Sequence, residues 1–228
     1  MAFIVIEGLD GAGKSTQVEL LSKYLQSMGK AVEYVHFPTG DSEIFGDMIN
    51  RFLRGEFGGI GDVNPYLVSL LFAGDRYNMA PKINAWLAEG KFVINDRYVY
   101  SNIGFQCAKI EDESEKKKLF DWIFNLEFNY FKIPRPDLNI FLDVPFSFTE
   151  KRLAENRTGK DRDYLNGKTD IHEADLNFQK KVRETYIKAA ETDSRLVRID
   201  CSCNGEMLLA ESISEKIVNE LRKHNFVK

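Results

Sequence analysis

The segment Gly8–Ser15, Gly-Leu-Asp-Gly-Ala-Gly-Lys-Ser, constrains this chain more than any other feature. It fits the pattern G-x-x-x-x-G-K-[ST] of a nucleotide-phosphate loop. The apolar run at residues 3–7 predicts a buried strand before the loop, and residues 15–28 predict a helix after it. In this order, strand, loop and helix direct backbone N–H groups and a helix N-terminus at one anion. We therefore expect a phosphate site supported by a sheet.

The chemistry of the loop is divided among its residues. The candidate ATP-binding positions are Gly8, Leu9, Asp10, Gly11, Ala12, Gly13, Lys14, Ser15 and Thr16. Lys14 supplies a catalytic positive charge for the β- and γ-phosphates, and the Ser15 hydroxyl can ligate Mg²⁺. Asp10 is unexpected, because a carboxylate repels phosphate; it should face a hydroxyl donor or metal-bound water instead. This indicates a second substrate beside the nucleotide triphosphate.

Strand and helix patterns alternate along the rest of the chain. Further strands are predicted at 31–37, 91–95, 138–144 and 196–200, and helices at 44–53, 64–89, 114–130, 146–156, 171–192 and 206–224. Pro81 should kink or break the helix at 64–89. This alternation predicts an α/β fold of the P-loop NTPase class, three-layer α/β/α, with a five-stranded parallel sheet. Because no linker or repeat interrupts the pattern, residues 1–228 should form a single domain.

Charge and composition narrow the classes of function. The chain has 31 basic and 35 acidic residues, a net charge of −4 that argues against nucleic-acid binding through a basic surface. No apolar run approaches the ~20 residues of a membrane span, and the N-terminus enters a strand without a signal-peptide pattern. The three cysteines show neither metal nor disulfide spacing. We expect a cytoplasmic protein with free thiols and no membrane or nucleic-acid partner.

A second group of polar residues follows the strand at 91–95. Ligands of open parallel sheets bind at the carboxyl ends of the strands, so Asp96 and Arg97 should lie beside the phosphate loop. Asp96 can hold water on Mg²⁺, and Arg97 can donate two hydrogen bonds to a phosphate; a strand-end salt bridge is the alternative. Phe72 and Arg76 share a helix face, which suits stacking on a base and bonding its edge. The alternative is that Phe72 is a core residue and Arg76 a surface charge.

A basic segment follows the strand at 138–144. Residues 151–168 carry six basic and three acidic side chains, with turn signals at Gly159 and Gly167. This pattern predicts a mobile lid at about 155–170 whose arginines stabilise a transferring phosphoryl group; a solvated surface loop is the alternative. The carboxylates of Asp170 and Glu173 can contact metal-bound water or orient lid arginines, and His172 should be exposed.

Together these motifs resemble the thymidylate kinase family. The resemblance is carried by the loop 8–17, Phe37-Pro38, Leu71-Phe72 with Asp75-Arg76, Asp96-Arg97-Tyr98 with Ser101, Pro136-Asp137-Leu138, Phe141–Val144, the lid, and Asp170-x-x-Glu173. It covers about residues 1–200. It implies transfer of the ATP γ-phosphate to dTMP with Mg²⁺, giving dTDP and ADP, by a homodimer packed through helices. The aromatic-rich segment 120–131 fits either a dimer interface or the core.

The resemblance also implies roles for individual residues. Asp10 would meet the 3′-hydroxyl of dTMP, Phe72 would stack on thymine, Arg76 would bond its O4 edge, and Arg97 would hold the acceptor phosphate. The other implied dTMP-binding residues are Phe37, Ser101, Asn102, Phe105 and Gln106, the last three on a helix after Asp-Arg-Tyr. Ser15, and Asp96 through water, would hold the metal, with Asp10 and Glu173 as further candidates. Because Gly11 replaces the loop arginine of some members, Arg157 and Arg162 would be the catalytic lid donors.

The chain departs from the family pattern at two places. Many members have an arginine just after Phe-Pro that touches the acceptor phosphate, whereas Thr39-Gly40-Asp41 stands here; Arg51 and Arg54 are the candidates to replace it. Some members have a tyrosine where Phe105 stands, near the sugar 2′ position, so discrimination against ribonucleotides is in question. Two other functions stay open: another P-loop nucleoside-monophosphate or deoxynucleoside kinase, and a GTPase or ATPase switch.

Overall fold

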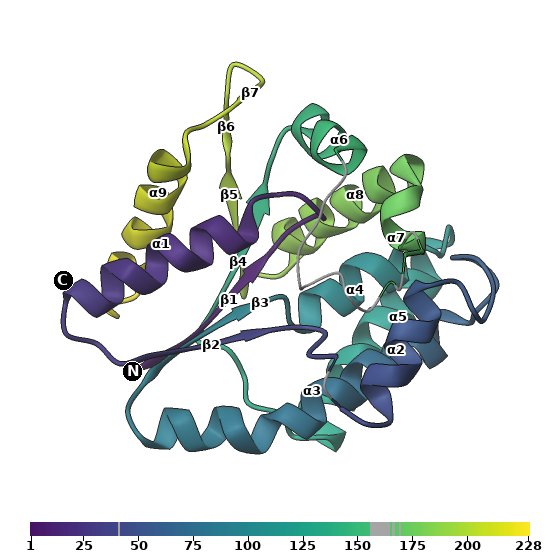
Figure 1. The fold of residues 1–228 in the computed structure, drawn as a ribbon, viewed down its shortest axis with the longest axis horizontal. Helices are drawn as coiled ribbons and strands as arrows, with labels where there is room; N and C mark the ends of the chain where they lie inside the picture. Colours follow the sequence, from purple (N-terminus) through teal and green to yellow (C-terminus); the bar gives the residue numbers. More distant parts are fainter. Residues whose placement is uncertain (41, 156–164, 166, 169) are drawn as a thin grey trace.

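The computed structural model describes residues 1–40, 42–155, 165, 167–168 and 170–228. Within this part of the chain, five parallel strands form a sheet in the order β2-β3-β1-β4-β5 (Figure 1). They span Ala2–Glu7 (β1), Val32–His36 (β2), Phe92–Asp96 (β3), Leu138–Asp143 (β4) and Leu196–Asp200 (β5). Parallel neighbours require crossover connections, usually helices, so this sheet confirms the fold class expected from the alternating sequence pattern.

Helices cover both faces of the sheet (Figure 1). They span Lys14–Ser27 (α1), Phe45–Leu53 (α2), Pro65–Ala88 (α3), Val99–Cys107 (α4), Glu113–Phe124 (α5), Phe146–Ala154 (α6), Ile171–Ala174 (α7), Leu176–Thr192 (α8) and Ala210–Lys223 (α9), with a π-helical turn at Asn125–Tyr130 (η1). On one face α1 packs beside α9, and on the other α4 packs against both α3 and α8.

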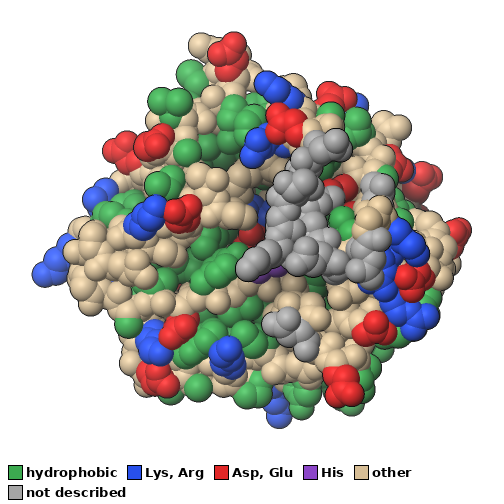
Figure 2. Space-filling view, in the orientation of Figure 1, with side chains coloured by type: hydrophobic (Ala, Val, Ile, Leu, Met, Phe, Trp, Pro, Cys, Tyr) green, Lys and Arg blue, Asp and Glu red, His purple; other side chains and the backbone are tan. Residues whose placement is uncertain are grey.

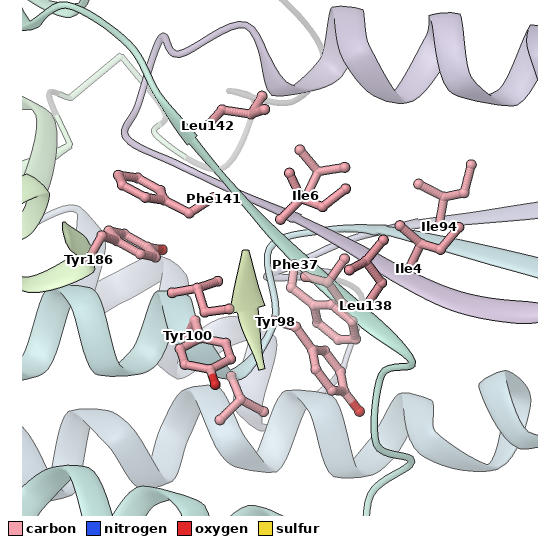
Figure 3. Close-up of a cluster of buried hydrophobic side chains, with 14 of the residues drawn as sticks. Ile4, Ile6, Phe37, Ile94, Tyr98, Tyr100, Leu138, Phe141, Leu142 and Tyr186 are labelled. Carbon is pink, nitrogen blue, oxygen red and sulfur yellow. The ribbon is translucent and has the colours of Figure 1, made fainter. Parts of the chain in front are cut away.

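The core lies on both sides of the three central strands. Every residue of β1, β3 and β4 is buried, whereas the edge strands β2 and β5 are partly exposed. A parallel sheet covered on both faces needs such continuous apolar strands. Figure 3 shows aromatic rings within this core, where Phe141 stacks on Tyr186 with ring centroids 4.7 Å apart and the ring of Phe37 lies 5.7 Å from that of Tyr98.

Four helix predictions differ in detail from the structure. The helix expected at 171–192 is two helices, because the Asp175 side chain accepts from the N–H groups of Asn177 and Phe178 and caps α8. The helix expected from 206 begins at Ala210, after a hairpin of Ser202–Cys203 (β6) and Glu206–Met207 (β7). Its turn residues Asn204 and Gly205 both have positive φ, as a tight hairpin requires.

The other two deviations concern α3 and α5. Pro81 does not break α3, which continues for 24 residues from its Asn64 cap. The helix predicted at 114–130 is α-helical only to Phe124 and continues as the π-helical η1.

The molecular surface carries both signs of charge. Lys or Arg and Asp or Glu side chains are interspersed over the face shown in Figure 2, in keeping with the small net charge of −4. Cys107, Cys201 and Cys203 are free thiols, as expected. In the part of the chain that the structure describes, no helix combines the length and apolar character needed to cross a membrane.

Candidate active site

The phosphate loop connects β1 to α1 as the sequence predicts. Gly13 caps α1 with a φ of 80°, and Gly11 has a φ of 74°, both in the left-handed region that favours glycine. Lys14, the first residue of α1, is buried, and its Nζ donates to the carbonyl oxygen of Leu9 at 2.9 Å. Burial lowers the pKa of Lys14 to about 8, and the positive charge of Arg97 adds to this effect. The Lys14 ammonium therefore lies against the loop backbone and lines the cavity beside it.

A cavity of about 420 Å³ opens beside the loop at the carboxyl ends of the central strands. Fourteen predicted site residues line it: Asp10, Gly11, Lys14, Ser15, Phe37, Phe72, Arg76, Asp96, Arg97, Ser101, Asn102, Phe105, Gln106 and Glu173. The remaining predicted loop positions, Gly8, Leu9, Ala12, Gly13 and Thr16, are described in the structure but do not line this cavity. The side chains of Leu9 and Ala12 pack into the hydrophobic core instead, and Thr16 is exposed on α1.

Arg97 ties the phosphate loop to the end of β3. Its backbone adopts a left-handed φ of 70°, which is uncommon for a residue with a side chain and is found most often at functional sites. Its Nη2 donates to Asp10 Oδ1 at 2.6 Å, and its Nη1 donates to the Gly8 carbonyl at 3.0 Å and to Ser101 Oγ at 3.2 Å. Arg97 thus forms the strand-end salt bridge considered above and also lines the cavity.

Asp10 accepts hydrogen bonds from two side chains. Besides Arg97, its Oδ2 accepts from Gln179 Nε2 at 3.0 Å. Burial alone would raise the pKa of Asp10, but the Arg97 guanidinium and the Lys14 ammonium hold it well below its usual value. Asp10 is therefore an ionised hydrogen-bond acceptor at the cavity wall. Gln179, on α8, was missed because it is one polar residue among many on an amphipathic helix.

Ser15 and Asp96 are the two predicted metal-binding residues whose side-chain oxygen atoms lie next to each other. Ser15 Oγ lies 3.5 Å from Asp96 Oδ2, and Asp96 Oδ1 has no hydrogen-bond partner among the described residues. Burial would raise the pKa of Asp96, but Lys14 and His36 hold it below its usual value. Hard oxygen donors of this kind fit Mg²⁺, which takes few protein ligands and keeps water and substrate phosphates. Among the described residues, no cluster of three or more His, Cys, Asp or Glu side chains forms a fuller metal cage.

The far end of the cavity contains Phe72, Arg76 and Asn102. Phe72 lines the cavity and also packs with a small hydrophobic cluster around Phe52. Arg76 is only 2% exposed, so the alternative of a surface charge was wrong. It forms a two-fold salt bridge to Glu127, with Nε–Oε2 and Nη2–Oε1 distances of 2.6 Å. The sequence analysis missed Glu127, although a carboxylate within the aromatic segment 120–131 was a signal that could have pointed to it.

The prediction for His172 was wrong. It is 6% exposed and lines the cavity. Its ring lies 4.9 Å from that of Phe105 and 5.4 Å from that of Phe52, and its Nε2 has no hydrogen-bond partner among the described residues. The physical reason is the break at Asp175, which separates α7 from α8 and lets its residues reach the cavity. Burial lowers the pKa of His172 to about 3, so the imidazole is neutral.

The arginines suggested to replace the missing family arginine lie elsewhere. Arg51 Nε and Arg54 Nε both donate to the Glu56 carboxylate, at 3.1 Å and 2.8 Å, and neither lines the cavity. The lid residues Arg157 and Arg162 lie outside the described residues, as does Asp41. The aromatic segment 120–131 packs partly against the core through Phe120, Phe124, Phe128 and Phe131.

Comparison with known proteins agrees with this geometry. Residues 6–213 match the family model described as thymidylate kinase. The chain belongs to the thymidylate kinase family. It is 40% identical to a probable thymidylate kinase of Thermococcus onnurineus over 196 residues, covering 83% of this chain and 84% of that protein. It is 32% identical to a probable thymidylate kinase of Methanosphaera stadtmanae over 222 residues, covering 96% and 99%.

A solved structure extends the likeness to the fold. The thymidylate kinase from Candida albicans superimposes with a TM-score of 0.71 at 25% sequence identity, covering 98% of this chain and 92% of that one. The family resemblance and the P-loop α/β fold expected from the sequence are therefore confirmed. As a member of the thymidylate kinase family, the protein is a phosphotransferase of the nucleoside-monophosphate kinase type.

Proposed function

We propose that this thymidylate kinase transfers the γ-phosphate of ATP to dTMP, giving dTDP and ADP. One observation carries the proposal: a single cavity is lined both by Lys14 and Ser15 of the phosphate loop and by Phe72 and Arg76, which we take as its base end. The ion pair of Arg97 and Asp10 also lines this cavity. A switch protein that only hydrolyses its nucleotide would not need the second end.

The loop end is suited to ATP. Backbone N–H groups of residues 8–13 and the N-terminus of α1 surround the β- and γ-phosphates, and Lys14 neutralises part of their charge. Ser15 and Asp96, the latter through water, would hold Mg²⁺. The bound ion would neutralise charge on the phosphates during transfer.

The base end is suited to thymine. Phe72 offers a ring for stacking. Arg76 presents N–H donors, and Asn102 presents Oδ1, an acceptor without a partner among the described residues. Thymine has a carbonyl at C4 and a donor at N3, so it complements this donor and acceptor. Cytosine has an amino group at C4 and an acceptor at N3, so both contacts are mismatched.

The sugar and phosphate of dTMP fit between the two ends. Asp10, ionised and at the cavity wall, accepts from the 3′-hydroxyl. A guanidinium carries five N–H donors, and the three contacts of Arg97 to described residues leave two for the acceptor phosphate. Phe37, Ser101, Phe105 and Gln106 complete the dTMP site, with Glu173 on the lid side. Asp10 and Glu173 can also contact metal-bound water.

Phosphoryl transfer in this site depends on positioning and on neutralising charge. Lys14 and Arg97 hold the donor and acceptor phosphates at one place. Arg157 and Arg162, on a lid at about 155–170, stabilise the negative charge of the transferring group. The chain acts as one domain. Its cysteines are free thiols, which fits a protein of the reducing cytoplasm.

We also propose a homodimer. Leu67, Leu70 and Tyr77 of α3 are exposed, and Tyr130 of η1 extends the same apolar surface beside Phe131, whose ring lies 4.9 Å from that of Tyr77. A second copy of this chain would bury it. Leu67→Glu should convert the dimer to a monomer in sedimentation velocity. Leu209→Glu, at an exposed leucine outside this surface, is the control.

The reaction is tested by ADP release with ATP and Mg²⁺, comparing dTMP, dUMP, UMP, CMP, AMP and no acceptor. The proposal expects release with dTMP, weaker release with dUMP and little with the others. A preference for another monophosphate would favour a different nucleoside-monophosphate kinase. Equal release with and without every acceptor would favour an ATPase or a switch, and the acceptor roles of Phe72, Arg76 and Arg97 would be withdrawn.

A further inference from the structure

Glu127 is a buried carboxylate that no step of the proposed reaction uses. It is fully buried and lies on η1, a single π-helical turn inserted after α5. Such turns are rare and occur frequently at functional sites. A buried carboxylate is stable only when it is paired and hydrogen-bonded. The partners of Glu127 are the two polar groups at the base end of the cavity.

The first partner is Arg76. Glu127 accepts from Arg76 Nε and Nη2, both at 2.6 Å, so the guanidinium plane is fixed by two parallel hydrogen bonds. Arg76 Nη1 donates to the carbonyl oxygen of Tyr98 at 3.3 Å. These contacts account for three of the five N–H donors, and the others lie on the guanidinium edge away from Glu127. Because a guanidinium has no acceptor, these contacts fix the direction in which Arg76 presents its remaining donors.

The second partner is Asn102. Its Nδ2 donates to Glu127 Oε1 at 3.1 Å and to the Ser69 carbonyl oxygen at 3.0 Å. Both amide hydrogens are thereby used, and Oδ1 is left as a buried acceptor without a partner among the described residues. An amide orientation is assigned by its hydrogen-bond network, and here two acceptors determine it. Asn102 lines the cavity, and this acceptor is the one hydrogen-bonding atom of its side chain left for a ligand.

We propose that Glu127 is a positioning residue that sets the polarity of the base-edge pair, Arg76 and Asn102. The proposal rests on the function proposed above. By accepting from both side chains, Glu127 orients a donor and an acceptor side by side. This order fits a pyrimidine with a C4 carbonyl and an N3–H, and excludes one with a C4 amino group and a bare N3. Glu127 therefore determines the choice of thymine over cytosine without touching the base.

The carboxylate is essential to this argument because it only accepts hydrogen bonds. A glutamine at the same place has one acceptor atom and one NH₂ group. Its NH₂ group would face a donor of Arg76 or Asn102, and where it faces Asn102 the Asn102 Nδ2 would keep only the Ser69 carbonyl oxygen as an acceptor. One acceptor instead of two would then hold the amide, so the rotated amide, whose NH₂ suits the bare N3 of cytosine, would be less disfavoured.

The test compares kcat/KM for dTMP and dCMP in the wild-type protein, Glu127→Gln and Glu127→Asp. We expect Glu127→Gln to lower the dTMP/dCMP ratio at least tenfold, mainly through the KM for dTMP. Glu127→Asp keeps two acceptor oxygens on a shorter side chain, so it should raise KM for both acceptors and keep the ratio within about threefold. The control is Glu115→Gln, at an exposed glutamate of α5, which should leave the ratio and both KM values unchanged.

Other outcomes overturn the inference. An unchanged ratio in folded Glu127→Gln would mean that Glu127 only fills the core. A ratio that falls equally in Glu127→Asp would mean that side-chain length matters rather than polarity. Should Glu127→Gln fail to fold, Glu127→Asp decides, since an unchanged KM or a lost ratio contradicts the proposal. Wild-type protein that does not phosphorylate dTMP would instead refute the proposed function.

Discussion

Arg97 Nη2 and Asp10 Oδ1 lie 2.6 Å apart, so the residue after β3 and the phosphate loop are joined by an ion pair. Arg97→Ala removes this contact together with donors for the acceptor phosphate. We expect kcat/KM for dTMP to fall at least a hundredfold, in the range seen when one catalytic hydrogen-bond donor is lost. Steady-state kinetics with each substrate varied measures this. Unchanged kcat and KM for dTMP would make Arg97 a structural residue only.

Lys14 predicts a pH dependence. Its pKa is about 8 in the free protein, so it is cationic below that pH and neutral above it. The value of kcat/KM for ATP, which reports the free enzyme, should therefore fall as pH rises through about 8. At saturating ATP the bound phosphates favour the cation, and the fall in kcat should move to higher pH. Lys14→Arg, whose charge does not titrate, should lose the limb near 8. A flat profile of kcat/KM from pH 7 to 9.5 would contradict the prediction.

A side chain at position 11 should lower the free energy of unfolding. The φ of Gly11 is +74°, and an added Cβ would lie 2.9 Å from the Cβ of Arg152. Gly29 has a similar φ of +72° but no atom within 4 Å of an added Cβ. Gly29→Ala should lower the unfolding free energy by about 1–2 kcal/mol through backbone strain alone, and Gly11→Ala by more. Chemical denaturation measures both. Equal losses would show that Arg152 moves aside at no cost.

Phe72 predicts an affinity effect. Base–aromatic stacking is worth about 1–3 kcal/mol in single-strand nucleic-acid proteins, so Phe72→Ala should weaken dTMP binding by roughly five- to 150-fold while ATP binding stays within about twofold. Isothermal titration with each nucleotide measures this. Phe57→Ala is the matched control, because Phe57 packs in the same cluster but does not line the cavity. An equal loss of dTMP affinity in both variants would assign Phe72 to the core.

The lid arginines predict a kinetic effect rather than a binding effect. Arg157→Ala and Arg162→Ala remove charge that acts on the transferring phosphoryl group, so kcat should fall at least tenfold with less than a threefold change in the KM for dTMP. Lys168→Ala, in the same basic segment but paired with Glu56 at 3.5 Å, is the control. Full kcat in both arginine variants would remove the lid from the catalytic mechanism.

The sequence alone determined the parts that depend on local pattern. Gly8–Ser15 identified the phosphate loop, because its glycines, Lys14 and Ser15 act through adjacent backbone. Alternating apolar and helical segments predicted the parallel sheet, since hydrophobic periodicity reports which faces are buried. Strand ends then located Asp96 and Arg97, because ligands bind at the carboxyl edge of such a sheet.

Tertiary structure decided what depends on residues distant in sequence. Glu127 meets Arg76 across 51 positions, and Gln179 meets Asp10 across 169. No local periodicity encodes such pairs, because chain topology and side-chain packing bring them together. His172 shows the same limit, since its burial against Phe105 follows from the break at Asp175 and the docking of α7. The motif therefore predicted a phosphate site at the loop, while long-range packing decided which groups line the cavity beside it.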